Sequence, residues 1–91
     1  MQAHPQEQEF SSELVLTLND SREVETIYQA LYPETIVTIS PRSRCTIEKQ
    51  NSNQLVLRFY ATDFVSLRAI LSSFFRWIDA AYESIQSCKK I

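Results

Sequence analysis

Hydrophobic positions along this chain follow two different periods, and each stretch with one period predicts one element. From Asp63 to Cys88 apolar residues recur every three or four positions without proline or glycine, which predicts one helix of about seven turns. Its apolar side chains fill an arc of roughly 160°, wider than the ~100° stripe that a helix needs to cover a sheet. The arc consists of Phe64, Leu67, Ile70, Leu71, Phe74, Phe75, Trp77, Ile78, Ala81, Tyr82 and Ile85. So wide an arc predicts a helix that covers a sheet and also touches a second neighbour. The members expected to face the sheet are Leu67, Phe74, Ile78 and Ile85.

Small side chains form a second stripe on an adjoining face of the same helix. It consists of Ser66, Ala69, Ser73, Ala80, Ser84 and Ser87, and Arg76 interrupts it. Small residues in register allow another helix to come close, and the donor fork of Arg76 is suited to a carboxylate on a partner. The same spacing is also that of an ordinary solvated helix face, so the pattern alone leaves both interpretations open.

The first third of the chain predicts a strand followed by a helix. Residues 10–18 alternate apolar and polar side chains, which is the period of a strand with one face on a core. Asp20 with Glu23 three residues later is a variant of the capping box that starts helices. We therefore expect a helix over 21–32, ended by Pro33 because proline lacks the backbone donor that would continue it.

The middle of the chain predicts a hairpin. Residues 34–40 fit either a strand or an extended crossover, and their pattern does not decide between the two. Residues 44–50 and 54–61 then alternate as two strands. Between them, the asparagines of Asn51-Ser52-Asn53 tolerate the positive φ that a tight turn requires.

The predicted order is β-α-β-β-α, an α+β fold of two layers with a three-stranded, mainly antiparallel sheet and both helices on one face. We expect a single domain over 10–88, a flexible N-terminal tail over 1–9 and a C-terminal tail over 89–91. The other face of the sheet stays uncovered and, with the strand edges, is a candidate for self-association. Its predicted side chains are Val15, Thr17, Thr46, Glu48, Val56, Arg58 and Tyr60.

Composition restricts the function mainly by exclusion. The chain has no glycine, which excludes glycine loops that cradle phosphates. Cys45 and Cys88 belong to no CxxC pair, which predicts free, partly buried thiols and no metal site. The single histidine, His4, lies in the predicted tail, so the domain cannot build a Ser-His or Cys-His arrangement. Asp79 and Glu83 are the one pair of carboxylates that could act as catalytic groups, and their spacing fits a solvated helix face. With these arrangements excluded, we expect neither an enzyme nor a cofactor.

Charge and hydropathy point to a cytoplasmic protein without membrane contact. No apolar run approaches the ~18 residues of a membrane span, and the first residues are too polar for a signal peptide. The net charge of −2 argues against nucleic-acid binding by overall charge. Basic side chains nevertheless gather around the hairpin, where they fit either phosphate contacts or protection of a small sheet against aggregation. They are Arg42, Arg44, Lys49 and Arg58.

The last helix also contains a motif. Leu67-Arg68-Ala69, followed by Ser72 to Ile78 (SSFFRWI), resembles the pattern LRAxxNSYLRWI of the small dimerisation subunit of the KEOPS (EKC) complex, the family that includes the L antigen proteins. A looser similarity extends over residues 10–82. Ser72 stands where the family has asparagine. The residues that match the motif are Arg68, Ala69, Ser73, Arg76 and Trp77.

This resemblance implies a non-catalytic subunit. In the family, the small subunit packs its helices against the catalytic subunit and homodimerises, and the complex makes the threonylcarbamoyl modification on adenosine beside the anticodon of tRNA. From the stripe and the motif together, the expected partner-binding residues are Ser66, Arg68, Ala69, Ser73, Arg76, Trp77 and Ala80. The resemblance also makes Arg42, Arg44, Lys49 and Arg58 possible tRNA contacts, with tRNA bound indirectly or weakly.

Three other interpretations stay open at this point. The substitution at Ser72 fits a diverged regulatory paralogue of the same family. The sheet and the basic hairpin fit a stand-alone RNA-binding α+β domain, although Tyr60 is the only aromatic residue predicted on the open face. An orphan dimeric domain is the third.

Overall fold

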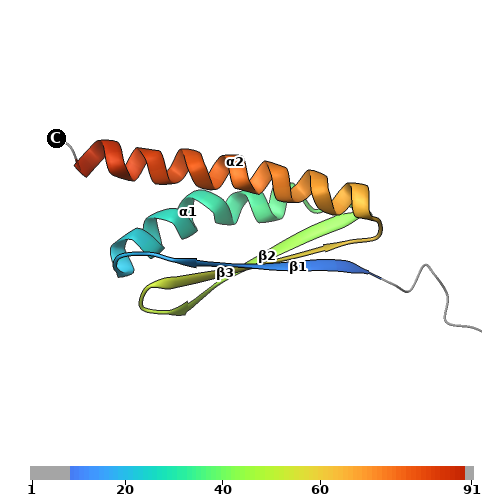
Figure 1. The fold of residues 1–91 in the computed structure, drawn as a ribbon, viewed down its shortest axis with the longest axis horizontal. Helices are drawn as coiled ribbons and strands as arrows, with labels where there is room; N and C mark the ends of the chain where they lie inside the picture. The colour runs from blue at the N-terminus through green and yellow to red at the C-terminus, as the bar shows by residue number, and fades with distance from the viewer. Residues whose placement is uncertain (1–8, 90–91) are drawn as a thin grey trace, which may run out of the picture.

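The computed structural model describes residues 9–89, and of Cys88 and Lys89 it describes only the backbone. The elements are β1 (Phe10–Thr17), α1 (Ser21–Val37), β2 (Ser43–Asn51), β3 (Gln54–Ala61) and α2 (Phe64–Lys89). The strands form one antiparallel sheet in the order β1-β3-β2, and both helices lie on one face of it (Figure 1). The predicted α+β fold and element order are confirmed. His4, with the rest of the predicted N-terminal tail up to residue 8, and residues 90–91 lie outside the described residues.

The register of the sheet separates a covered face from an open one. Leu57 of β3 pairs with Leu14 on one side and Ile47 on the other, while the next residue, Arg58, pairs with Glu13 and Thr46. Because successive side chains of a strand point to opposite faces, the leucine row lies under the helices and the arginine row on the open face. All the side chains predicted for the open face lie there: Val15, Thr17, Thr46, Glu48, Val56, Arg58 and Tyr60.

The core lies between the covered face and the two helices. Phe59 of β3 and Phe74 of α2 are both fully buried, and their ring centroids are 5.4 Å apart in an edge-to-face arrangement. Edge-to-face contact is a favoured geometry for buried aromatic rings. The other buried members of this cluster are Val24, Ile27, Leu31, Cys45, Leu55, Leu57, Ala61, Leu67 and Ile70.

α1 begins as the capping pattern predicts. Asp20 Oδ1 accepts a hydrogen bond of 2.9 Å from the Glu23 backbone N–H. The Glu23 carboxylate accepts hydrogen bonds from the backbone N–H and the side-chain amide of Asn19. Glu23 therefore satisfies donors ahead of the helix although it is itself buried.

The predicted end of α1 at Pro33 is wrong. The helix continues through Pro33 to Val37, so residues 34–37 are helical rather than a strand or an extended crossover. Proline removes one hydrogen bond from the ladder, but Leu31 before it and Thr35 after it are both buried. Packing of this face holds the last turn in place, and Thr38, the C-cap, donates its backbone N–H and its hydroxyl to the Glu34 carbonyl.

α2 matches the long helix predicted over 63–88 to within one residue at each end. Asp63 caps it, because its Oδ1 accepts a 2.7 Å hydrogen bond from the Ser66 backbone N–H. Hydrogen bonds from the backbone and side chain of Ser66 lower the pKa of the Asp63 carboxyl. Leu67 and Phe74, two of the residues expected to face the sheet, are buried, and the other two, Ile78 and Ile85, are partly buried against the same core.

Candidate interaction surfaces on the last helix

α2 has an exposed flank on each side of its buried stripe. One flank carries the first four residues of the predicted stripe, Ser66, Ala69, Ser73 and Ala80, together with Arg76, which interrupts it. We call these five residues the small-residue stripe. Ala69, Arg76 and Ala80 are exposed, while Ser66 and Ser73 are half-buried. The structure thus places all five of these predicted partner-binding residues on one side of the helix.

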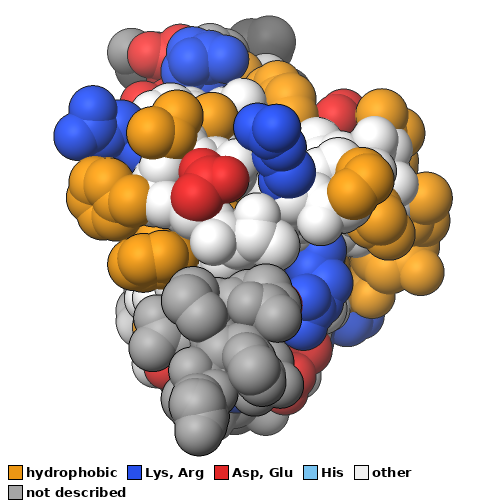
Figure 2. Space-filling view, turned by 90° about the vertical axis from the view of Figure 1, so that its right-hand side faces the viewer, with side chains coloured by type: hydrophobic (Ala, Val, Ile, Leu, Met, Phe, Trp, Pro, Cys, Tyr) orange, Lys and Arg blue, Asp and Glu red, His pale blue; other side chains and the backbone are white. Residues whose placement is uncertain are grey.

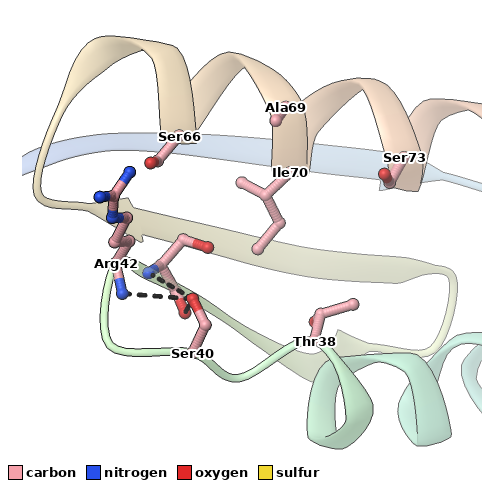
Figure 3. A pocket seen from close by; sticks show the side chains of 8 residues that line it. Thr38, Ser40, Arg42, Ser66, Ala69, Ile70 and Ser73 are labelled. Carbon is pink, nitrogen blue, oxygen red and sulfur yellow. Dashed lines mark hydrogen bonds between the residues drawn. The ribbon is translucent and has the colours of Figure 1, made fainter.

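The first half of the small-residue stripe forms one wall of a groove. The opposite wall is the loop between α1 and β2, and the groove has a volume of about 310 Å³. Figure 3 shows Ala69 and Ser73 pointing from α2 toward this space, and Arg42 reaching up from the loop toward Ser66. The complete lining is Thr38, Ser40, Arg42, Ser43, Ser66, Ala69, Ile70 and Ser73.

The other two predicted partner-binding residues lie off the stripe. Trp77 is half-buried and packs edge-to-face on Phe74, with ring centroids 5.0 Å apart, so it belongs to the margin of the core. Arg68 is exposed, and its guanidinium carbon lies 5.5 Å from the centroid of the Phe64 ring. The structure therefore does not gather all the motif residues on one surface.

The opposite flank of α2 exposes aromatic side chains that the sequence assigned to a single apolar arc. Phe64, Phe75 and Tyr82 are 56%, 48% and 40% exposed. At ~100° per residue their spacings bring them back to nearly the same side of the helix. Phe10 of β1 is also exposed and contacts Phe64 at a centroid distance of 6.3 Å. We call these four residues the aromatic row.

The aromatic row is the feature that sequence reasoning missed, although a signal for it was present. Figure 2 views the end of the molecule where β1 and α2 begin, and hydrophobic side chains gather there on both flanks with charged side chains between them. The excess width of the apolar arc predicted a second neighbour. What the sequence did not give was which members of the arc stay exposed.

The four basic residues near the hairpin do not form one surface. Arg44 and Arg58 lie on the open face of the sheet, whereas Lys49 lies on the covered side, close to α1. Arg44 pairs with Glu9 at 3.0 Å, and Arg58 pairs with both Glu13 at 3.0 Å and Glu48 at 2.8 Å.

Lys49 is also satisfied within the chain. Its Nζ donates to the Glu25 carboxylate at 2.6 Å and lies 4.8 Å from the centroid of the Tyr28 ring. This hydrogen bond raises the pKa of Lys49 and lowers the pKa of Glu25. Arg42, in contrast, forms no ion pair with any residue that the structure describes.

The described residues contain no site for metal or thiol chemistry. Cys45 is buried and free, and burial raises the pKa of its thiol to about 12, which makes it a poor nucleophile near neutral pH. The side chain of Cys88 lies outside the described residues. In residues 9–89 no three His, Cys, Asp or Glu side chains come together as a possible metal site. No helix of that range has the length and hydropathy of a membrane span.

Two comparisons with known proteins give matches. The family model described as "Transcription factor Pcc1" matches residues 11–86. A chain in the crystal structure of a binary complex Gon7-Pcc1 has the same fold, with a TM-score of 0.76 and 19% sequence identity. The match covers 87% of this chain and 95% of that chain. No curated protein matches the sequence.

Proposed function

The chain belongs to the Pcc1 family, the family of small KEOPS subunits that its last helix resembles, and we propose that it is a non-catalytic interaction subunit of a KEOPS complex. In this proposal it binds the catalytic subunit through α2 and homodimerises. It thereby supports threonylcarbamoyl modification of adenosine beside the anticodon of tRNA in the cytoplasm. The chain itself supplies no catalytic group.

The observation that supports this proposal best is the pair of exposed flanks on α2. The aromatic row leaves large apolar side chains in water on one flank, while the small-residue stripe offers a close approach on the other. Clustered exposed apolar surface of this kind is typical of interaction sites, and small residues permit helices to pack closely. We propose that a helical hairpin of the catalytic subunit packs across α2, with one helix on each flank.

Self-association is proposed for the sheet side of the molecule. β1 and β2 are both edge strands, because β3 lies between them. Edge strands present unpaired backbone groups that can pair with another chain. The matched crystal structure is a complex of two proteins, Gon7 and Pcc1, which supports an assembly role for this fold. Light scattering coupled to size-exclusion chromatography should give the mass of a dimer, and a monomer mass at micromolar concentration would contradict self-association.

We assign tRNA contact to the assembled complex rather than to the isolated chain. Arg44, Lys49 and Arg58 are each paired with a carboxylate of the same chain. Phosphate contact would have to replace those ion pairs. We therefore expect the stand-alone RNA-binding interpretation to fail for these three residues.

The test compares equal substitutions on α2 and on the open face. Ala69→Arg should obstruct the small-residue stripe, and Phe75→Glu should place a charge in the aromatic row. Thr46→Arg and Thr46→Glu introduce the same side chains at an exposed position of the open face. The readout is co-purification with the catalytic subunit, with circular dichroism as the measure of folding.

We expect both α2 variants to lose the catalytic subunit while both Thr46 variants retain it, with unchanged spectra in all four. Loss in Ala69→Arg alone would restrict the docking surface to the small-residue stripe, and loss in Phe75→Glu alone would restrict it to the aromatic row. Full binding by both α2 variants would show that the catalytic subunit does not use α2.

A further inference from the structure

We infer that residues 34–39 are a two-state segment: besides the helical turn that ends α1, they form a fourth strand paired with the free edge of β2. The starting observation is a conflict between local sequence and structure. The five residues from Thr35 to Ile39 are all β-branched, a class of side chain that favours strands over helices. They nevertheless form the last turn of α1 and its cap, although Pro33 precedes them within the same helix.

Few contacts hold this turn in its helical state. Of residues 33–39, Thr35 is the one buried side chain, and its hydroxyl donates to the Tyr32 carbonyl at 2.7 Å. Pro33 lacks the backbone N–H that would bond to the preceding turn. The large apolar side chains of the segment are more than half exposed, and they are Ile36, Val37 and Ile39. Leaving the helix therefore costs this segment little burial.

β2 has a free edge next to this segment, because among the described strands it pairs with β3 alone. The Thr62 backbone N–H donates to the Arg42 carbonyl at 2.9 Å, so Arg42 directs its carbonyl toward the β3 side. Arg44, two residues further on, has the same orientation because the hydrogen-bonding groups of a strand alternate between its two sides. The residues whose backbone groups point toward the free edge are Ser43, Cys45 and Ile47.

The first hydrogen bond of the additional strand is present in the structure. The Ser40 backbone N–H donates to the Ser43 carbonyl at 3.0 Å, across the two residues Pro41 and Arg42. A bond of this kind closes a hairpin with a two-residue loop. Ser40 Oγ accepts the Ser43 backbone N–H at 3.2 Å, in the place that the Ser40 carbonyl takes in a complete hairpin (Figure 3). The loop thereby sets the register in which residues 34–39 pair with β2.

This register gives the two states different neighbours. Counting back from the turn, Val37 lies opposite Thr46 on the open face, and Ile36 lies opposite Ile47 on the side covered by the helices. Cross-strand pairs of β-branched side chains stabilise a sheet. In the helical state, α1 and the Thr46 side chain lie on opposite faces of the sheet (Figure 1), so contact between Val37 and Thr46 is specific to the strand state.

The strand state covers the free edge of β2. An edge strand offers unpaired backbone groups to other chains, and a strand supplied by the same chain removes them. α1 then ends at Tyr32, immediately before Pro33, where helices usually end. The segment thus controls whether β2 is open to a second copy of the chain. This consequence rests on the proposed self-association, whereas the two states themselves do not.

A disulfide between positions 37 and 46 tests for the strand state. Val37→Cys and Thr46→Cys are combined in the full chain, with Cys45→Ala and Cys88→Ala to remove the natural thiols. The control pair is Val37→Cys with Val15→Cys, since Val15 is an exposed open-face residue of β1, at the far edge of the sheet. Both proteins are oxidised with glutathione disulfide, and mass spectrometry measures disulfides formed within one chain. Circular dichroism before oxidation measures folding.

We expect the disulfide between positions 37 and 46 to form about tenfold faster than that of the control pair, whose positions lie too far apart to be bridged. Pro33→Ala in the same background should slow it by about tenfold, because alanine stabilises the helical state. Equal rates for the two pairs would overturn the inference in favour of capture during global unfolding. A rate unaffected by Pro33→Ala would also overturn it.

Relaxation dispersion on the natural chain tests the same inference without any substitution. The minor state of residues 34–39 should have the carbon chemical shifts of a strand, and random-coil shifts would overturn the inference in favour of a frayed helix end.

Light scattering then tests the consequence for self-association. The chain with the disulfide between positions 37 and 46 should stay monomeric while its reduced form dimerises. A disulfide-bonded chain that still dimerises would overturn the control of self-association by this segment. A monomeric reduced form would contradict the proposed self-association instead, with the two states still supported by the disulfide rates.

Discussion

The open face of the sheet and the outer surface of α2 are both exposed to solvent, but they differ in how far their charged and apolar side chains have partners within the chain. On the open face, Arg58 lies between Glu13 and Glu48 and pairs with both. On α2, Arg76 forms no ion pair with a described residue, and Phe75 is almost half exposed. The open face pairs its arginine within the chain, whereas α2 has an arginine without an ion pair and an aromatic ring almost half exposed.

Under the proposed function, this difference assigns partner binding in the chain of 91 residues to α2. Small domains bury a modest fraction of their surface, so exposing several large aromatic side chains costs them stability. Under the proposed function, a partner covers these residues on α2 and offsets that cost. The ion pairs of Arg58 with Glu13 and Glu48 on the open face, in contrast, need no partner to explain them.

The largest effect is expected inside the molecule, where the two faces of the sheet can be compared directly. Phe59→Ala removes a fully buried ring that contacts Phe74, and should lower the free energy of unfolding by about 3–5 kcal/mol. Val15→Ala on the open face, where the side chain is 46% exposed, should cost under about 1 kcal/mol. Urea denaturation measures both, and similar losses would contradict the division into a covered and an open face.

A second prediction uses Cys45 to test how well the helices exclude water from the covered face. Burial raises the pKa of the folded thiol from its ordinary value of 9.0 to about 12. The unfolded state therefore loses this proton first. The stability that the protonated Cys45 thiol contributes is intact below pH 9 and is lost as the pH rises from 9 to 12. The loss is at most about 1.4 kcal/mol per pH unit in this range.

The measurement is urea denaturation between pH 8 and pH 11 on the natural chain and on Cys45→Ala. The natural chain should lose more stability with rising pH than the variant does, because tyrosine and lysine titration affects both equally. Parallel pH profiles would mean that the thiol is hydrated in the folded state.

A third prediction concerns the ion pairs of the open face. Arg58→Ala removes the partner of both Glu13 and Glu48, and we expect it to lower the free energy of unfolding by a small amount, well below that of Phe59→Ala. The side chains are more than one third exposed, so salt should screen the pairs and reduce the effect. Thermal denaturation at low and high salt measures this, and an effect that grows with salt would contradict it. Binding of the catalytic subunit should be unchanged.

Most of the fold could be predicted from periodicity, and the exceptions have physical causes. Residues 54–61 were predicted with the bounds that β3 has, because alternation over a central strand is unambiguous. The end of α1 was wrong because the rule for Pro33 is local, while the burial of Leu31 and Thr35 depends on the sheet beneath them.

The candidate surfaces were predictable only in part. The small-residue stripe follows from spacing along one helix, and its five members do share a flank. The groove could not be predicted, because its two walls are α2 and a loop more than twenty residues earlier in the chain, and the periodicity of each segment does not show that they lie side by side. Phe74 was expected to face the sheet and is buried, but the arc did not predict that its neighbour Phe75 stays almost half exposed, because that depends on how the helix is rotated over the sheet.

The smallest effect on stability is expected for Arg76, and it is the sharpest test of the contrast between the two surfaces. Arg76→Ala removes an exposed side chain without an ion partner among the described residues, so the free energy of unfolding should change by less than about 0.5 kcal/mol. Its affinity for the catalytic subunit should nevertheless fall by about tenfold, since a docked guanidinium is expected to pair with a carboxylate. Arg58→Ala is the matched control, with the opposite outcome on both measurements. If Arg76→Ala destabilised the chain as much as Arg58→Ala and left the affinity intact, α2 and the open face would not differ in the way that their contacts indicate.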